Sequence, residues 1–150
     1  MKKLALVAAI VAAMLFPTTA IASYDRNDWP YAWRECPVTT RSGVTYVLVD
    51  DPEYGDFASV VDVSAKKKVV TIPFAVWEGG KRYGVGSICD GTLSECPKLR
   101  DVYLMADLQE CTDMTLLEGD DRDVTIHVYT TDDYDWLTRD GNTSRVVAEY

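Results

Sequence analysis

The sequence contains one histidine, His127, so a Ser–His–Asp or Cys–His catalytic arrangement would have to include it. His127 lies inside the short β-branched segment 124–128, and the chain has no Gly-x-Ser-x-Gly, Gly-x-Gly-x-x-Gly or Walker-type motif. A general acid/base pair such as Glu53 with Asp56 stays open, although nothing in the sequence favours it. We therefore expect His127 to be a surface strand residue, and we expect no enzymatic activity and no cofactor.

Two acidic clusters, residues 120–123 and 132–135, carry the oxygen ligands that Ca²⁺ prefers. An EF-hand loop starting at Asp133 fails, because it places Leu137 where a ligand is required. We expect residues 132–135 to begin a helix capped by Thr130 or Thr131, where acidic side chains suit the helix dipole. We expect residues 120–123 to form a solvated turn. The sequence leaves open whether the acidic clusters bind Ca²⁺.

The first 22 residues have the pattern of a cleavable secretory signal peptide. Two lysines precede the apolar run 4–16, and the small residues Ala20 and Ala22 fit signal peptidase before a cut at Ser23. The run is too short to span a bilayer core of about 30 Å. We therefore expect a bacterial exported protein, periplasmic or extracellular, with no membrane span.

Removal of those two lysines leaves 13 Lys+Arg against 24 Asp+Glu, a net charge of about −11. A surface this acidic repels polyanions over most of its area, so we expect no nucleic acid as a partner. Residues 23–150 suit one domain with one core.

The four cysteines, Cys36, Cys89, Cys96 and Cys111, are an even number in an exported chain, which favours disulfides. Three pairings are possible, and the alternative for each cysteine is a buried thiol. The cysteine spacing and the single histidine do not fit a structural zinc site, and we expect no metal.

The chain from Val44 onward has mostly the pattern of short strands. Residues 23–43 show no period and predict an irregular N-terminal extension. The expected strands are 44–49 and 58–63 as a hairpin, 69–72, and 74–77 with 82–85 around a Gly-Gly turn.

Beyond Val85 the segments align with one another. Residues 88–93 match 111–116 at an offset of 23, and 101–104 match 123–126 at an offset of 22. Such a period indicates stacked units that bury a shared core, because one unit cannot cover its own apolar side.

These segments resemble the BspA-like leucine-rich repeat proteins. The resemblance rests on Val70-Thr71-Ile72-Pro73, on Tyr83–Ile88 and on Leu93–Leu104, with Cys96 at the family cysteine position. Thr92-Leu93 replaces the usual Ala-Phe pair. The match covers about residues 44–140.

The resemblance implies a mainly β fold with short helices: a short leucine-rich-repeat solenoid of three rungs, 69–72, 99–104 and 124–128. An N-terminal β-hairpin over 44–63 and a C-terminal helix over 132–138 would cap its ends. The organisation is then a signal peptide 1–22, the extension 23–43, and a leucine-rich-repeat-like domain 44–150.

This register also implies which side chains point inward and outward, since strand residues alternate. The inward set is Leu99, Val102, Leu104, Val124, Ile126 and Val128. The register further implies two disulfides, Cys89–Cys111 and Cys36–Cys96.

The function implied by the resemblance is a secreted, non-catalytic module that binds another protein or a cell-surface component. The candidate contact residues are Tyr103, Thr125, His127 and Tyr129 on the outer side of the rungs, and Trp77 on the hairpin. Tyr and Trp suit interfaces, although these residues serve equally well to cover the sheet. The alternatives are a small extracellular enzyme, an enzyme inhibitor, or an accessory envelope fragment. The sequence does not indicate the oligomeric state.

Overall fold

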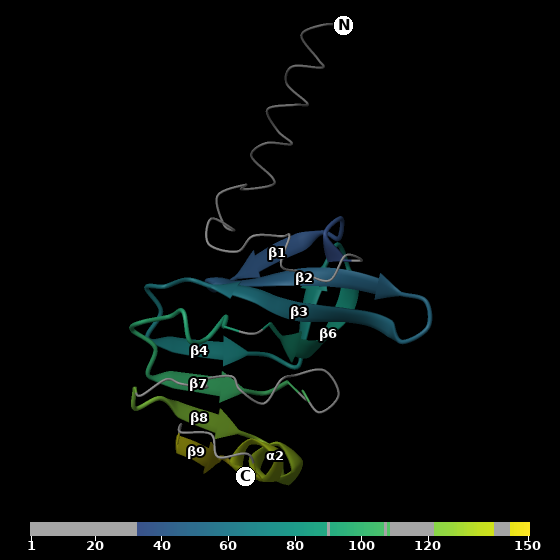
Figure 1. Ribbon diagram of the computed structural model, residues 1–150. Coiled ribbons are helices and arrows are strands. Elements are labelled where there is room, and N and C mark those ends of the chain that lie inside the picture. Colours follow the sequence, from purple (N-terminus) through teal and green to yellow (C-terminus); the bar gives the residue numbers. More distant parts are fainter. Residues whose placement is uncertain (1–32, 90, 107, 109–121, 140–144) are drawn as a thin grey trace, which may run out of the picture.

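The computed structural model describes residues 33–89, 91–106, 108, 122–139 and 145–150. The predicted signal peptide, most of the predicted extension, and Cys111 lie outside these residues. The fold is mainly β, with one α-helix among the described residues, and its strands form two sheets (Figure 1).

The first sheet has five strands in the order β1-β2-β3-β6-β5. Their bounds are β1 Val38–Arg41, β2 Val44–Asp51, β3 Gly55–Val63, β5 Ala75–Glu78 and β6 Lys81–Ile88. Both predicted hairpins are confirmed. Strand β1 was not predicted. It folds back onto β2 through Ser42 and Gly43, which both have positive φ (51° and 79°), the geometry of a tight hairpin turn.

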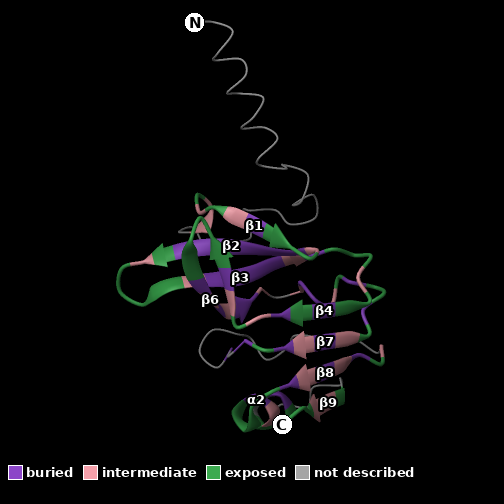
Figure 2. Cartoon of the chain, turned by 180° about the vertical axis from the view of Figure 1, so that it is seen from behind, coloured by how far each residue is buried: buried purple, intermediate pink, exposed green. Residues whose placement is uncertain are grey.

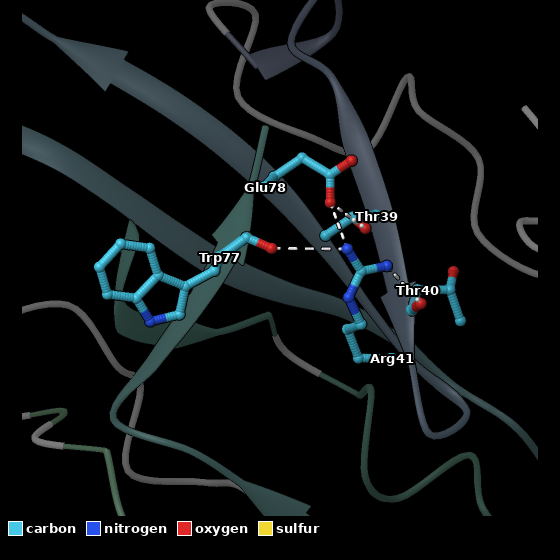
Figure 3. Close-up of polar contacts among 5 residues, drawn as sticks. All are labelled: Thr39, Thr40, Arg41, Trp77 and Glu78. Carbon is cyan, nitrogen blue, oxygen red and sulfur yellow. Dashed lines mark hydrogen bonds and ion pairs between the residues drawn. The ribbon is translucent and has the colours of Figure 1, made fainter. Parts of the chain in front are cut away.

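The first sheet curls until its two edge strands, β1 and β5, face each other (Figure 3). The Arg41 guanidinium pairs with the Glu78 carboxylate and donates to the Trp77 carbonyl oxygen at 3.4 Å. The Thr39 hydroxyl also donates to Glu78, at 3.0 Å. These side-chain contacts cover edges that would otherwise invite pairing with another chain.

The second sheet is parallel, with the order β4-β7-β8-β9. Its strands are β4 Val69–Ile72, β7 Asp101–Leu104, β8 Thr125–Val128 and β9 Arg145–Ala148. The three predicted rungs are confirmed as strands, although β7 and β8 begin one or two residues later than expected. Strand β9 was not predicted, so the helix does not end the sheet as expected.

Helix α2, Thr131–Arg139, follows β8 and confirms the predicted C-terminal helix. The Thr130 hydroxyl accepts a hydrogen bond from the Asp133 backbone N–H at 3.1 Å, which makes Thr130 the N-cap. Asp132 and Asp133 lie in the first turn, as the sequence predicted.

The predicted alignment of β7 with β8 was wrong by two residues. The sequence alignment matched Asp101 with Asp123, whereas the structure pairs Asp101 with Thr125. A shift of two leaves every side chain on the same face of a strand, because side chains alternate with a period of two. The predicted inward residues are therefore buried despite the wrong register.

The main core lies between the inner face of the parallel sheet and the curled sheet. Val102, Leu104, Ile126 and Val128 are completely buried, and Tyr46 from β2 belongs to the same cluster. Figure 2 colours the buried parts of the strands purple. A smaller cluster of Val47, Val49 and Val61 lies apart from this core, with Cys36 and Cys89 packed against it.

Cys96 is a buried free thiol in the main core. It donates to the carbonyl oxygens of Val63 (3.4 Å) and Thr92 (3.5 Å), and burial raises the pKa of the thiol. The predicted Cys36–Cys96 bridge is therefore not formed in this structure, since Cys36 packs against the other cluster. Cys111 lies outside the described residues, so the predicted Cys89–Cys111 bridge stays a prediction.

Candidate functional site

The outer face of the parallel sheet brings together four of the five predicted contact residues. Each inward residue of β7 and β8 alternates with an outward one that is only partly buried. Asp101 is the Cα partner of Thr125, and Tyr103 is the partner of His127. Tyr129 follows β8 directly.

Tyr103 and His127 stack at the centre of this face. Their ring centroids are 4.2 Å apart, and the rings are inclined by only 8°. Parallel in-register pairing of β7 with β8 places the two side chains side by side, so the stack is a direct consequence of the sheet.

Two carboxylates hold the His127 ring from opposite sides. Nδ1 lies 2.6 Å from Glu149 Oε1, and Nε2 lies 3.1 Å from Asp101 Oδ1. An ionised carboxylate only accepts hydrogen bonds, so the protonated imidazolium, in which both ring nitrogens donate, is the form of the ring that this arrangement favours. Desolvation acts to lower the pKa of His127, but the hydrogen bonds to Glu149 and Asp101 outweigh it and raise the pKa. The stack is therefore fixed in one orientation.

This arrangement predicts a pH-dependent contribution to stability. A His127 pKa that is raised in the folded state stabilises the fold below the unfolded pKa of about 6.5, and the effect is lost as pH rises through the folded pKa. The advantage of the native protein over His127→Gln should therefore be larger at pH 5.5 than at pH 8.5, by up to about 1 kcal/mol. Denaturant titration of both proteins at the two pH values measures it. An advantage that stays constant, or grows with pH, contradicts the assignment.

Two exposed apolar side chains extend the face at the ends of its strands. Met105, which follows β7, is 45% exposed, and Tyr129, which follows β8, is 40% exposed. The Met105 N–H donates to the Ile72 carbonyl at 2.9 Å, which fixes this segment beside β4. The face thus presents the stacked Tyr103 and His127 rings at its centre and two exposed apolar side chains at its margin.

Trp77, the fifth predicted contact residue, lies in β5 of the other sheet and does not belong to this face. It is 60% exposed, and its ring points away from Arg41 (Figure 3). Arg82 is its Cα partner on β6, and the Arg82 guanidinium lies 5.6 Å from the centroid of the exposed Phe74 ring. Trp77 therefore belongs to a separate aromatic patch.

Sequence reasoning missed Asp101 and Glu149 as partners of His127. Asp101 begins β7 next to β8, and the alternation that predicted Tyr103 as outward applies equally to Asp101. Glu149 follows β9, and its N–H donates to Val128 at 2.8 Å. No local signal places Glu149 beside His127, because this contact depends on an unpredicted parallel strand.

No group of three or more His, Cys, Asp or Glu side chains in the described part of the chain is arranged to hold a metal ion. Asp101 and Glu149 bind opposite nitrogens of the same ring, so their carboxylates do not converge on one point. Of the acidic segment 120–123, the first two residues lie outside the description. Among the described residues, no helix has the length and apolar character needed to cross a membrane.

No protein-family model and no curated protein matches the chain. A solved structure, described as a leucine rich cell surface protein from Faecalibacterium prausnitzii A2-165, is similar at 19% sequence identity and a TM-score of 0.38. The similarity covers 52% of this chain and 18% of that chain. The chain therefore spans less than a fifth of the length of the protein it matches.

Proposed function

We propose that this chain is an exported, non-catalytic protein-binding module of the BspA-like leucine-rich repeat type, and that the outer face of the parallel sheet is its contact surface. The observation that carries the proposal is the Tyr103–His127 stack. Both rings are fixed by the sheet and by two carboxylates before any partner arrives. A preorganised aromatic surface loses little conformational entropy on binding, which favours affinity.

The composition of the face supports a protein as the partner. Tyrosine and methionine are enriched in the cores of protein interfaces, and Tyr129 and Met105 flank the stack with much of their surface exposed. The flanking carboxylates of Asp101 and Glu149 each have a hydrogen-bond partner in the His127 ring, so they oppose burial less than unpaired carboxylates would. The repeat part of the proposal is supported by β4, β7 and β8, which are parallel and bury Val, Ile and Leu side chains on one side.

Affinity capture tests the proposal. Immobilised protein, residues 23–150, is exposed to envelope extract and to host extracellular material, and retained proteins are identified and their Kd measured. Tyr103→Ala should weaken the interaction by about 30-fold or more, the effect of losing a central hot spot of about 2 kcal/mol. Tyr54→Ala is the matched control, because Tyr54 is 81% exposed on the distant β2–β3 hairpin.

The two variants separate the possible outcomes. A partner lost with Tyr103→Ala and retained with Tyr54→Ala places the contact on this face. Equal affinity of both variants for every captured partner would rule this face out as the binding surface. A partner lost with Trp77→Ala instead would move the site to the curled sheet.

A further inference from the structure

The positive charges of the described chain are concentrated at one end of the parallel sheet. Strands β4, β7, β8 and β9 all begin at this end, because they are parallel and in register (Figure 1). Besides Arg122, whose guanidinium donates to the carbonyl oxygens of Ser94 and Cys96, six cationic side chains precede these strands or open them, and we call these six the cationic rim: Lys66, Lys67, Lys68, Lys98, Arg100 and Arg145.

Backbone hydrogen bonds fix the spacing of the rim. The N–H groups of Arg100 and Asp101 both donate to the Lys68 carbonyl, at 2.8 and 3.2 Å, so Lys68 and Arg100 lie on neighbouring strands. Neighbouring strands are about 4.8 Å apart. Arg145 begins β9 and its N–H donates to the Val124 carbonyl at 3.1 Å, which places it three strands from β4. The cations therefore form a row about 14 Å long across the strand starts.

The rim cations are not used to hold the fold together. Elsewhere Arg41 pairs with Glu78, and Lys81 pairs with both Asp50 and Asp56. The six rim side chains, in contrast, make no ion pair and donate no side-chain hydrogen bond to any described residue. Five of them are exposed, and Lys67 is half-buried against Gly43. Their mutual repulsion is thus left uncompensated within the described protein.

Carboxylates at the same end are fewer or already engaged. Asp101 is bound to His127, and Asp62 also has a partner. Glu95 and Asp123 are exposed in the segments that precede β7 and β8. Among the described residues at this end, the six rim cations therefore outnumber the exposed carboxylates, Glu95 and Asp123, on a protein of net charge −9.

The opposite end carries negative charge. Asp51 and Glu53 lie at the β2–β3 hairpin tip beside the Asp50–Lys81 ion pair, and Asp132 lies in the first turn of α2 after β8. Figures 1 and 2 both place this hairpin tip on the side toward which β4, β7 and β8 point. An anionic ligand is therefore attracted to one end of the molecule and repelled from the other, so it meets the protein in a defined orientation.

We propose that the cationic rim binds a linear anionic polymer, with phosphate or carboxylate groups along its length, which crosses the starts of β4, β7 and β9. A row of cations matches charges repeated along a chain. A flat anionic membrane fits less well, because it would also meet Glu95 and Asp123, and Val69 is the one large apolar side chain at the rim that is strongly exposed.

Fluorescence anisotropy with labelled polyphosphate and labelled poly-glutamate tests the rim, and the two probes distinguish phosphate from carboxylate recognition. Binding at 50 mM salt should weaken at 200 mM, because neutralised polymer charges release counterions. Lys68→Gln combined with Arg100→Gln should weaken binding at least 10-fold. It should also lower the slope of log K against log salt by about one to two.

Arg82→Gln is the matched control, because Arg82 is an exposed arginine on the other sheet and its replacement removes the same charge as Arg100→Gln. Selective loss with Arg100→Gln, with unchanged circular dichroism and Tm, supports the rim. Equal loss with Arg82→Gln would show a net-charge effect and overturn the proposal. Failure to bind either polymer at 50 mM salt, or binding to anionic phospholipid vesicles alone, would also overturn it.

Discussion

Ile126→Ala should lower the free energy of unfolding by about 2–5 kcal/mol, the usual cost of deleting a fully buried aliphatic side chain. Ile126 is completely buried at the centre of the parallel sheet, between Val102 on β7 and Val146 on β9. Strands β7 and β9 lie on either side of Ile126, and they limit how far the structure can close the cavity that the lost atoms leave. Urea denaturation followed by circular dichroism measures the change.

The neighbouring residue provides the control for Ile126→Ala. Thr125 is on the same strand but faces outward, so Thr125→Ala should cost less than about 1 kcal/mol. Similar losses from the two substitutions would contradict the assignment of inner and outer faces. That assignment also supports the candidate contact surface, so this pair of variants tests the framework of the proposed site without a partner.

Local pattern predicted most strands of this fold because their apolar residues alternate. The segments around Val60, Val70 and Ile126 were recognisable from β-branched residues and flanking turns. The inward face survived a register error of two residues, since the alternation repeats every two. A register error of one would have placed Ile126 outside and reversed the predicted contact residues.

Long-range pairing was not predictable in the same way. Strand β1 depends on a hairpin turn at Ser42 and Gly43, and Ser42 is a residue that rarely adopts positive φ. Strand β9 is a four-residue edge strand, and no local sequence pattern indicates that it pairs with β8. The Glu149–His127 contact follows from β9, and the Arg41–Glu78 contact follows from β1. The candidate site was therefore predicted in Tyr103, His127 and Tyr129, whereas the two carboxylates that hold the His127 ring were missed.

Tyr46→Ala should destabilise the protein by about 3–5 kcal/mol, because it removes a large aromatic ring from the main core. Tyr46 is 1% exposed and belongs to the same buried cluster as Ile126, although the two residues lie in different sheets. If this shared core makes the two sheets one cooperative unit, each substitution lowers a single unfolding transition. Two separate transitions, with only one of them shifted by Tyr46→Ala, would instead show that the sheets unfold independently.

Tyr46→Phe removes only the hydroxyl group, and we expect its effect on the free energy of unfolding to depend on pH only in the alkaline range. Burial raises the pKa of Tyr46 from 10 to about 12, so between these values the unfolded chain releases the phenol proton while the folded protein keeps it. Native stability therefore falls as pH rises through this window, by about 1.4 kcal/mol per pH unit, and the contribution is absent below pH 10. Phenylalanine has no proton to release. The difference in unfolding free energy between Tyr46→Phe and the native protein should consequently grow in favour of phenylalanine from pH 9 to pH 11. A difference that does not change over this range would mean that the hydroxyl reaches solvent, and that the core beneath the curled sheet is less closed than the packing of Tyr46 indicates.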